Sequence, residues 1–142
     1  MVAVVLTLVA AGGATGVYFS GQAQHRRDRA EILAWERNVL PAGVEAQQIQ
    51  RSLEHTGVDR AAARTSLARD RSVLLAGPVA EVVRPAVASY VTAIDKALVA
   101  LDAAGTSGFP TAIRAAAAAF SAAAQAEQDL VCRARLPACH RP

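Results

Sequence analysis

The chain has 142 residues, of which 53% are hydrophobic but only 4% aromatic, and its formal net charge is +3. Much of the hydrophobic fraction is alanine, which has the highest helix propensity and buries little area. The basic residues are spread along the chain among the acidic ones, so the composition excludes a concentrated basic surface for nucleic acid. We therefore expect a helical protein with a thin core and no nucleic-acid partner.

The first feature along the chain is an uncharged stretch from Val2 to Phe19. A membrane-spanning helix needs about 20 apolar residues, whereas a signal peptide has a basic start and small residues before its cleavage site. The basic start is missing, although Gly21 and Ala23 suit a cleavage site. We expect residues 1–23 to be a transmembrane anchor, with a cleaved signal segment as the alternative, and residues 1–20 to contact the lipid membrane.

The direction of this anchor is set by opposing signals. Arg26, Arg27 and Arg29 follow the uncharged stretch, and by the positive-inside rule they favour a cytoplasmic domain. Cys132 and Cys139 favour the opposite side, because disulfides persist in oxidising compartments. We expect a single-pass protein of the cell membrane with an extracytoplasmic domain, and the cytoplasmic orientation stays open.

Four helical segments follow, over about residues 24–55, 59–76, 79–104 and 110–135. Their apolar residues recur at steps of three and four, as on one face of a helix. The pattern is clearest in the first segment (Ile32, Trp35, Val39, Ala42, Ala46, Ile49 and Leu53) and in the third (Val83, Val87, Tyr90, Ile94, Ala97 and Leu101). It keeps its phase across Pro41, so we expect a bend at this proline and not an end.

Four amphipathic helices joined by short connections pack most simply as an antiparallel up-down four-helix bundle. We therefore predict an all-α fold, with residues 24–136 as the bundle domain behind an N-terminal apolar helix and residues 137–142 as a C-terminal tail. Gly77 and Pro78 either separate two helices or kink one, in which case the bundle has three long helices.

The two cysteines of the chain, Cys132 and Cys139, lie near its C-terminal end. In an oxidising compartment we interpret them as a disulfide that clamps this end. The alternatives are two free thiols, or a metal site that adds His140. The sequence lacks the paired C-x-x-C spacing and a clear fourth ligand, so we predict no metal site and no cofactor.

Two other features bear on function. Trp35 and Tyr90 lie on apolar helix faces, where core packing is their simplest role and a ligand pocket between helices is the functional one. Gly12 and Gly16 form a G-x-x-x-G pattern, which brings membrane helices together or arises by chance in a stretch rich in Gly and Ala.

The chain contains no nucleophile elbow, phosphate-binding glycine loop, HExxH motif or inward pair of carboxylates, so we expect no catalytic activity. We infer a membrane-tethered interaction protein, an accessory subunit or scaffold that contacts a protein partner or forms a homodimer. The alternative is a sensing or carrier bundle that binds a small apolar or anionic ligand between its helices.

Overall fold

Five helices make up the regular structure of the residues that the computed structural model describes, which are 5–55, 57–76 and 79–135. They are α1 (Val5–Asn38), α2 (Leu40–Ser52), α3 (Arg60–Leu75), α4 (Arg84–Asp102) and α5 (Phe109–Arg135). No strand occurs among these residues, so the all-α class predicted from the sequence is confirmed. Side chains are described over residues 21–134, apart from the two gaps.

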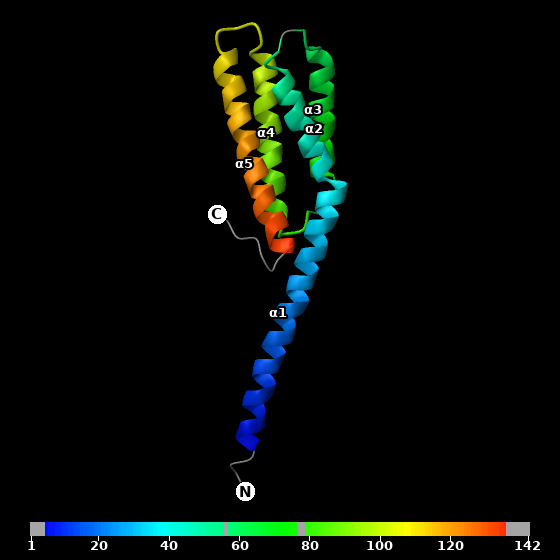
Figure 1. The fold of residues 1–142 in the computed structure, drawn as a ribbon, viewed down its shortest axis with the longest axis vertical. Coiled ribbons are helices and arrows are strands. Elements are labelled where there is room, and N and C mark those ends of the chain that lie inside the picture. The colour runs from blue at the N-terminus through cyan, green and yellow to red at the C-terminus, as the bar shows by residue number, and fades with distance from the viewer. Residues whose placement is uncertain (1–4, 56, 77–78, 136–142) are drawn as a thin grey trace.

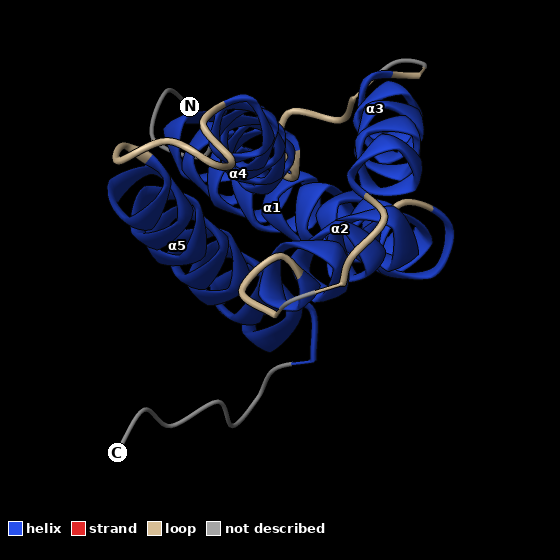
Figure 2. Cartoon of the chain, turned by 90° about the horizontal axis from the view of Figure 1, so that it is seen from above, coloured by secondary structure: helices blue, strands red, loops and turns tan. Residues whose placement is uncertain are grey.

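The helices α2, α3, α4 and α5 pack side by side into one body, from which α1 projects (Figure 1). Viewed from above, α3 and α5 lie on opposite sides of this body, with α2 and α4 between them (Figure 2). The last turns of α1 pack against α5 and α2. Residues from Gly21 to Glu31 are exposed apart from half-buried Asp28, and burial begins at Ile32.

The predicted membrane anchor is wrong. In the part of the chain that the structure describes, no helix has the length and apolar character needed to cross a membrane, which removes the support for a transmembrane helix or signal anchor. The apolar part of α1 covers residues 5–19, about 22 Å at 1.5 Å per residue, whereas the hydrocarbon core is about 30 Å thick. Glycines and threonines dilute this part, and the same helix then continues into the charged residues that follow.

The helix expected over residues 24–55 is interrupted near Pro41. Its ladder breaks at Val39, which has φ −118° and ψ −41° and precedes the first turn of α2. Pro41 lies in this first turn, where a backbone N–H would have no partner within the helix, so a proline there costs α2 no hydrogen bond. The interruption is one residue long, and the chain bends there, so that α2 leans away from the direction of α1 (Figure 1).

The buried face of α2 agrees in part with the predicted pattern. Ala46 and Leu53 of that pattern are buried after Pro41, as predicted. Next to the interruption burial falls on Leu40 and Gly43, and Gln50 is buried in place of Ile49, which is only half-buried. The predicted phase therefore holds at two positions beyond Pro41 and is displaced by one residue at the others.

A glycine in the left-handed conformation and an aspartate cap precede α3. Gly57 has a φ of +92°, the left-handed conformation that glycine adopts without strain. Asp59 then caps α3, and its Oδ1 accepts hydrogen bonds from the backbone N–H groups of Ala61 and Ala62, both at 3.0 Å. The alternatives for Gly77 and Pro78 lie outside the described residues.

The helix α4 begins at Arg84, five residues later than expected, and its predicted face is confirmed. Pro85 lies in the first turn of α4, which is where a proline costs a helix least. Residues 79–83 are therefore left as a turn, not as helix. All six predicted inward residues of this segment are buried, and they are Val83, Val87, Tyr90, Ile94, Ala97 and Leu101.

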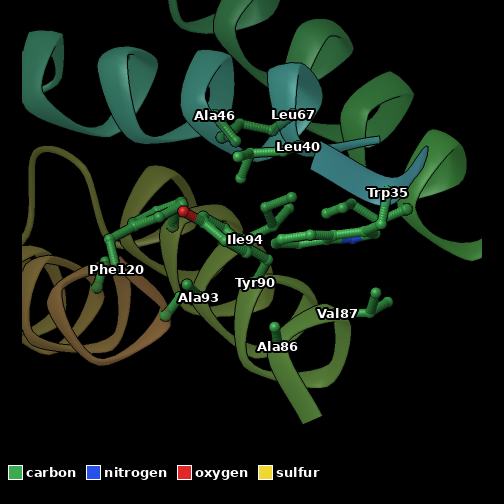
Figure 3. Packing of buried hydrophobic residues seen from close by; sticks show 14 of the residues in the cluster. Trp35, Leu40, Ala46, Leu67, Ala86, Val87, Tyr90, Ala93, Ile94 and Phe120 are labelled. Atoms are coloured by element: carbon green, nitrogen blue, oxygen red, sulfur yellow. The ribbon is translucent and has the colours of Figure 1, made fainter. Parts of the chain in front are cut away.

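The core between α2 and α4 depends on one close contact. Gly43 is buried against the ring of Tyr90, which is itself only 1% exposed. Tyr90 and Ile94 point from α4 into the same space as Leu40 and Ala46 of α2 (Figure 3). The small residues of α2 therefore let its backbone approach the large side chains of α4.

We expect Gly43→Ala to destabilise the fold, because its Cβ would lie 2.9 Å from Cδ1 and Cε1 of Tyr90. Overpacking against this buried ring costs about 1–3 kcal/mol of folding stability. This cost exceeds the stability that alanine gains over glycine through its higher helix propensity. Gly21→Ala is the matched control, since its Cβ would meet nothing within 4 Å. Urea unfolding followed by circular dichroism measures both, and an unchanged midpoint for Gly43→Ala would contradict the contact.

Candidate functional site

A pocket of about 470 Å³ lies between the last turns of α1 and the connection from α3 to α4. Pockets that bind small molecules have volumes of about 300–1,000 Å³ and mostly apolar walls with a few polar groups. Most of the described lining is aliphatic or aromatic, and the polar side chains are those of Glu31 and Asn38. The pocket therefore has the size and chemistry of a ligand site.

One wall of the pocket is a single stripe of α1. Glu31, Ala34, Trp35 and Asn38 stand at positions i, i+3, i+4 and i+7, which lie on one face of a helix. Trp35 is buried at the middle of the stripe, and the polar residues at its two ends are exposed. The wall is thus apolar at its centre and polar at both ends.

The opposite wall follows from the late start of α4. Leu74 comes from the last turn of α3, and Val79, Ala80 and Val83 come from the connection that precedes α4. A helix beginning at Val79, as the sequence analysis predicts, would not place this connection over α1. Pro85 therefore shapes the pocket indirectly, through the residues that it keeps out of α4.

Trp35 carries an unsatisfied polar group at this wall. Its side chain is 4% exposed, and its Nε1 is buried without a hydrogen-bond partner among the described residues. The ring points toward α4, which carries Val87 and Ile94 (Figure 3). Buried indole N–H groups usually find an acceptor, so this unpaired donor makes the packing of Trp35 against α4 less stable than its apolar contacts alone would make it.

Tyr90, the other residue predicted to line a ligand pocket, does not line this one. Its hydroxyl donates a hydrogen bond to Oε2 of Glu127 at 2.6 Å, and its ring packs against Phe120. Burial disfavours the phenolate and the bond to Glu127 favours the protonated form, so the pKa of Tyr90 is raised. Tyr90 is therefore a packed core residue, and of the predicted pair only Trp35 lines the pocket.

Asp70 is a buried acid that the sequence analysis did not single out. It is 1% exposed, and its position was readable because Ala63, Leu67, Asp70 and Leu74 follow one another at helical steps of four, three and four. Its Oδ1 accepts a bond from Arg69 Nη2 at 3.1 Å, and Arg69 also pairs with Glu45. Its Oδ2 is buried with no partner among the described residues.

The environment of Asp70 favours its protonated form. Burial raises the pKa of this carboxyl above its usual value, and the hydrogen bond from Arg69 only partly opposes the shift. The folded chain therefore holds this proton more tightly than the unfolded chain. The resulting stabilisation is present below the ordinary pKa of aspartate and is lost as the pH rises through the folded-state pKa.

We expect Asp70→Asn to be more stable than the parent at pH 7, because the amide removes the cost of a buried charge. The gain should disappear in acid, where Asp70 is protonated in both states. Asp95→Asn is the control, since Asp95 is about half exposed and pairs with Arg71 at 2.7 Å. Urea unfolding at pH 7 and at about pH 2.5, which is below the ordinary pKa of aspartate, measures the difference. An Asp70→Asn variant less stable than the parent at pH 7 would overturn this account.

Cys132 forms a disulfide. Cys139, the partner that the sequence predicts, and His140 of the alternative metal site lie outside the described residues, so the pairing stays a prediction. No group of three or more histidine, cysteine, aspartate or glutamate side chains that could hold a metal ion occurs in the described part of the chain.

Gly12 and Gly16 lie in α1, four residues apart and therefore on one face of that helix. The structure describes only the backbone around them. Their proposed role in helix pairing is neither supported nor excluded by a described contact.

Comparisons with family models, with curated proteins and with solved structures give no significant match to this chain. Function has therefore to be argued from the pocket and the exposed surfaces alone.

Proposed function

We propose that this chain is a small-molecule-binding protein, a sensor or carrier, whose ligand occupies the Trp35 pocket. The observation that carries this proposal is the cavity of about 470 Å³, which has Trp35 at the middle of one wall and the polar side chains of Glu31 and Asn38 at the ends of that wall. A ligand of drug-like size would fill the apolar centre of the pocket.

The composition of the pocket supports binding and not catalysis. Glu31 is the only ionisable side chain in its described lining. Acid-base and nucleophilic catalysis rely on at least two groups in mutual hydrogen-bond reach, such as a nucleophile and its base. We therefore propose that the ligand leaves the pocket chemically unchanged.

The framework of this site, in our proposal, is an antiparallel up-down bundle of α2, α3, α4 and α5. Two features support it: the connections between these helices are short, and each helix packs on the next one in the sequence. We also propose that the protein works in an oxidising compartment, because Cys132 is disulfide-bonded.

We expect Ala80→Leu to lower the affinity for an apolar probe by at least about tenfold, because Ala80 is part of the pocket wall and leucine would fill the space. The probe is 4-phenylbutan-1-ol, titrated by calorimetry. Ala118→Leu, at an exposed position of α5, is the matched control and should bind like the parent. Equal affinities for both variants, or no binding to the parent, would count against the pocket.

The projecting part of α1 supports a second candidate function, that of an interaction protein. Residues 21–27 of α1 are all exposed, and they extend away from the body as an isolated helix (Figure 1). An isolated helical segment of this kind is only marginally stable in water, so packing against another helix would stabilise it. The occupant that we propose is a second copy of this chain, pairing through the face of α1 that carries Gly12, Gly16 and Ala23.

Light scattering of the full chain tests this pairing. We expect twice the monomer mass of 14.7 kDa. The Ala23→Glu variant should give the monomer mass, because it places a charge in the proposed contact. Ala118→Glu changes an equally exposed alanine of the body and should leave the dimer intact. A monomeric parent at all concentrations would exclude the homodimer.

A further inference from the structure

We infer that the Trp35 pocket selects an amphiphilic cation, a protonated amine attached to an apolar body. This inference rests on the proposed ligand-binding function and adds the charge of the ligand to it. It replaces the anionic ligand considered in the sequence analysis, for reasons that lie in the pocket's two polar side chains.

The first reason is the carboxylate at the pocket. Glu31 is the only charged residue of the described lining, and neither Arg nor Lys contributes to it. Glu31 also forms no ion pair in the described part of the chain, unlike Glu45, Asp95 and Asp102, which each pair with an arginine. Its negative charge is therefore free to meet a ligand.

The second reason is the order of groups along the α1 wall. Glu31 precedes Trp35 by one helical turn on the same face of α1. A ligand whose amine contacts the Glu31 carboxylate would therefore place its apolar part beside Trp35. Leu74 and Val83 face this position from the opposite wall and are buried. Asn38, one turn further along, offers a carbonyl oxygen to a second polar group.

The expected selectivity is modest, because Glu31 is exposed to solvent. Exposed ion pairs gain little and are screened by salt, and an ammonium group near an indole ring adds a comparable cation–π contribution. Together they should favour an amine over a neutral molecule of the same shape by about three- to tenfold at low salt.

Three probes with the same phenylbutyl body separate charge from shape: 4-phenylbutylamine, 4-phenylbutan-1-ol and 4-phenylbutanoate. We expect calorimetric titration of the full chain at pH 7 to rank them in this order of affinity. High salt should weaken only the amine relative to the alcohol. Glu31→Gln should reduce the amine's advantage to the part that the indole supplies and leave the affinity for the alcohol unchanged.

Glu81→Gln is the matched control, because Glu81 is an exposed acid in the turn beside the pocket but does not line it. It should retain the parent's preference for the amine. Equal binding of the three probes would overturn the inference and leave the ligand-binding function standing. Preference for the acid would also overturn it, and would point to Arg27, one turn before Glu31, as the headgroup contact. Failure of all three to bind would overturn both proposals.

Discussion

The missing N–H of proline determines where two of the five helices begin, and the pocket depends on both starts. Pro41 and Pro85 each lie in the first turn of a helix, α2 and α4, because only there is no backbone hydrogen bond lost. The first start separates α2 from α1 by one residue, Val39, which is part of the pocket lining. The second leaves the residues before Arg84 to lie over Trp35. The pocket thus forms where helices begin and end, and it does not require an inserted loop.

Alanine and glycine make the rest of this arrangement possible. Along α4 and α5 the buried face mixes alanines with about one large side chain per turn. The alanines let the two helices pack closely, and the large side chains fill the space between them. Tyr90 is the clearest case: its ring lies against Gly43, while its hydroxyl reaches Glu127 on α5. A core of this kind tolerates little change of volume at its contacts.

The sequence predicts the features of this protein that arise from local periodicity. The inward face of α4 and the capping by Asp59 follow from spacing and residue type alone, and both are observed. The face of α2 follows only in part: Ala46 and Leu53 are buried as predicted, but beside the break at Val39 burial falls on Leu40. Trp35 was recognisable as a pocket residue, but the opposite wall required the tertiary position of a turn. The anchor prediction failed because it gave too little weight to the glycines and threonines of the apolar stretch, and no helix among the described residues is long and apolar enough to cross a membrane.

The continuity of α1 gives the molecule a mechanical property. The turns that form the pocket wall and the turns that project from the body belong to one uninterrupted helix, Val5–Asn38. From Ile32, where burial begins, to Val5 this helix forms an arm of about 40 Å at 1.5 Å per residue. A tilt of about 5° at the pocket would displace the far end by about 3.5 Å, by the same geometry. Any tilt of α1 at the pocket is therefore enlarged, by simple geometry, at the far end of this helix.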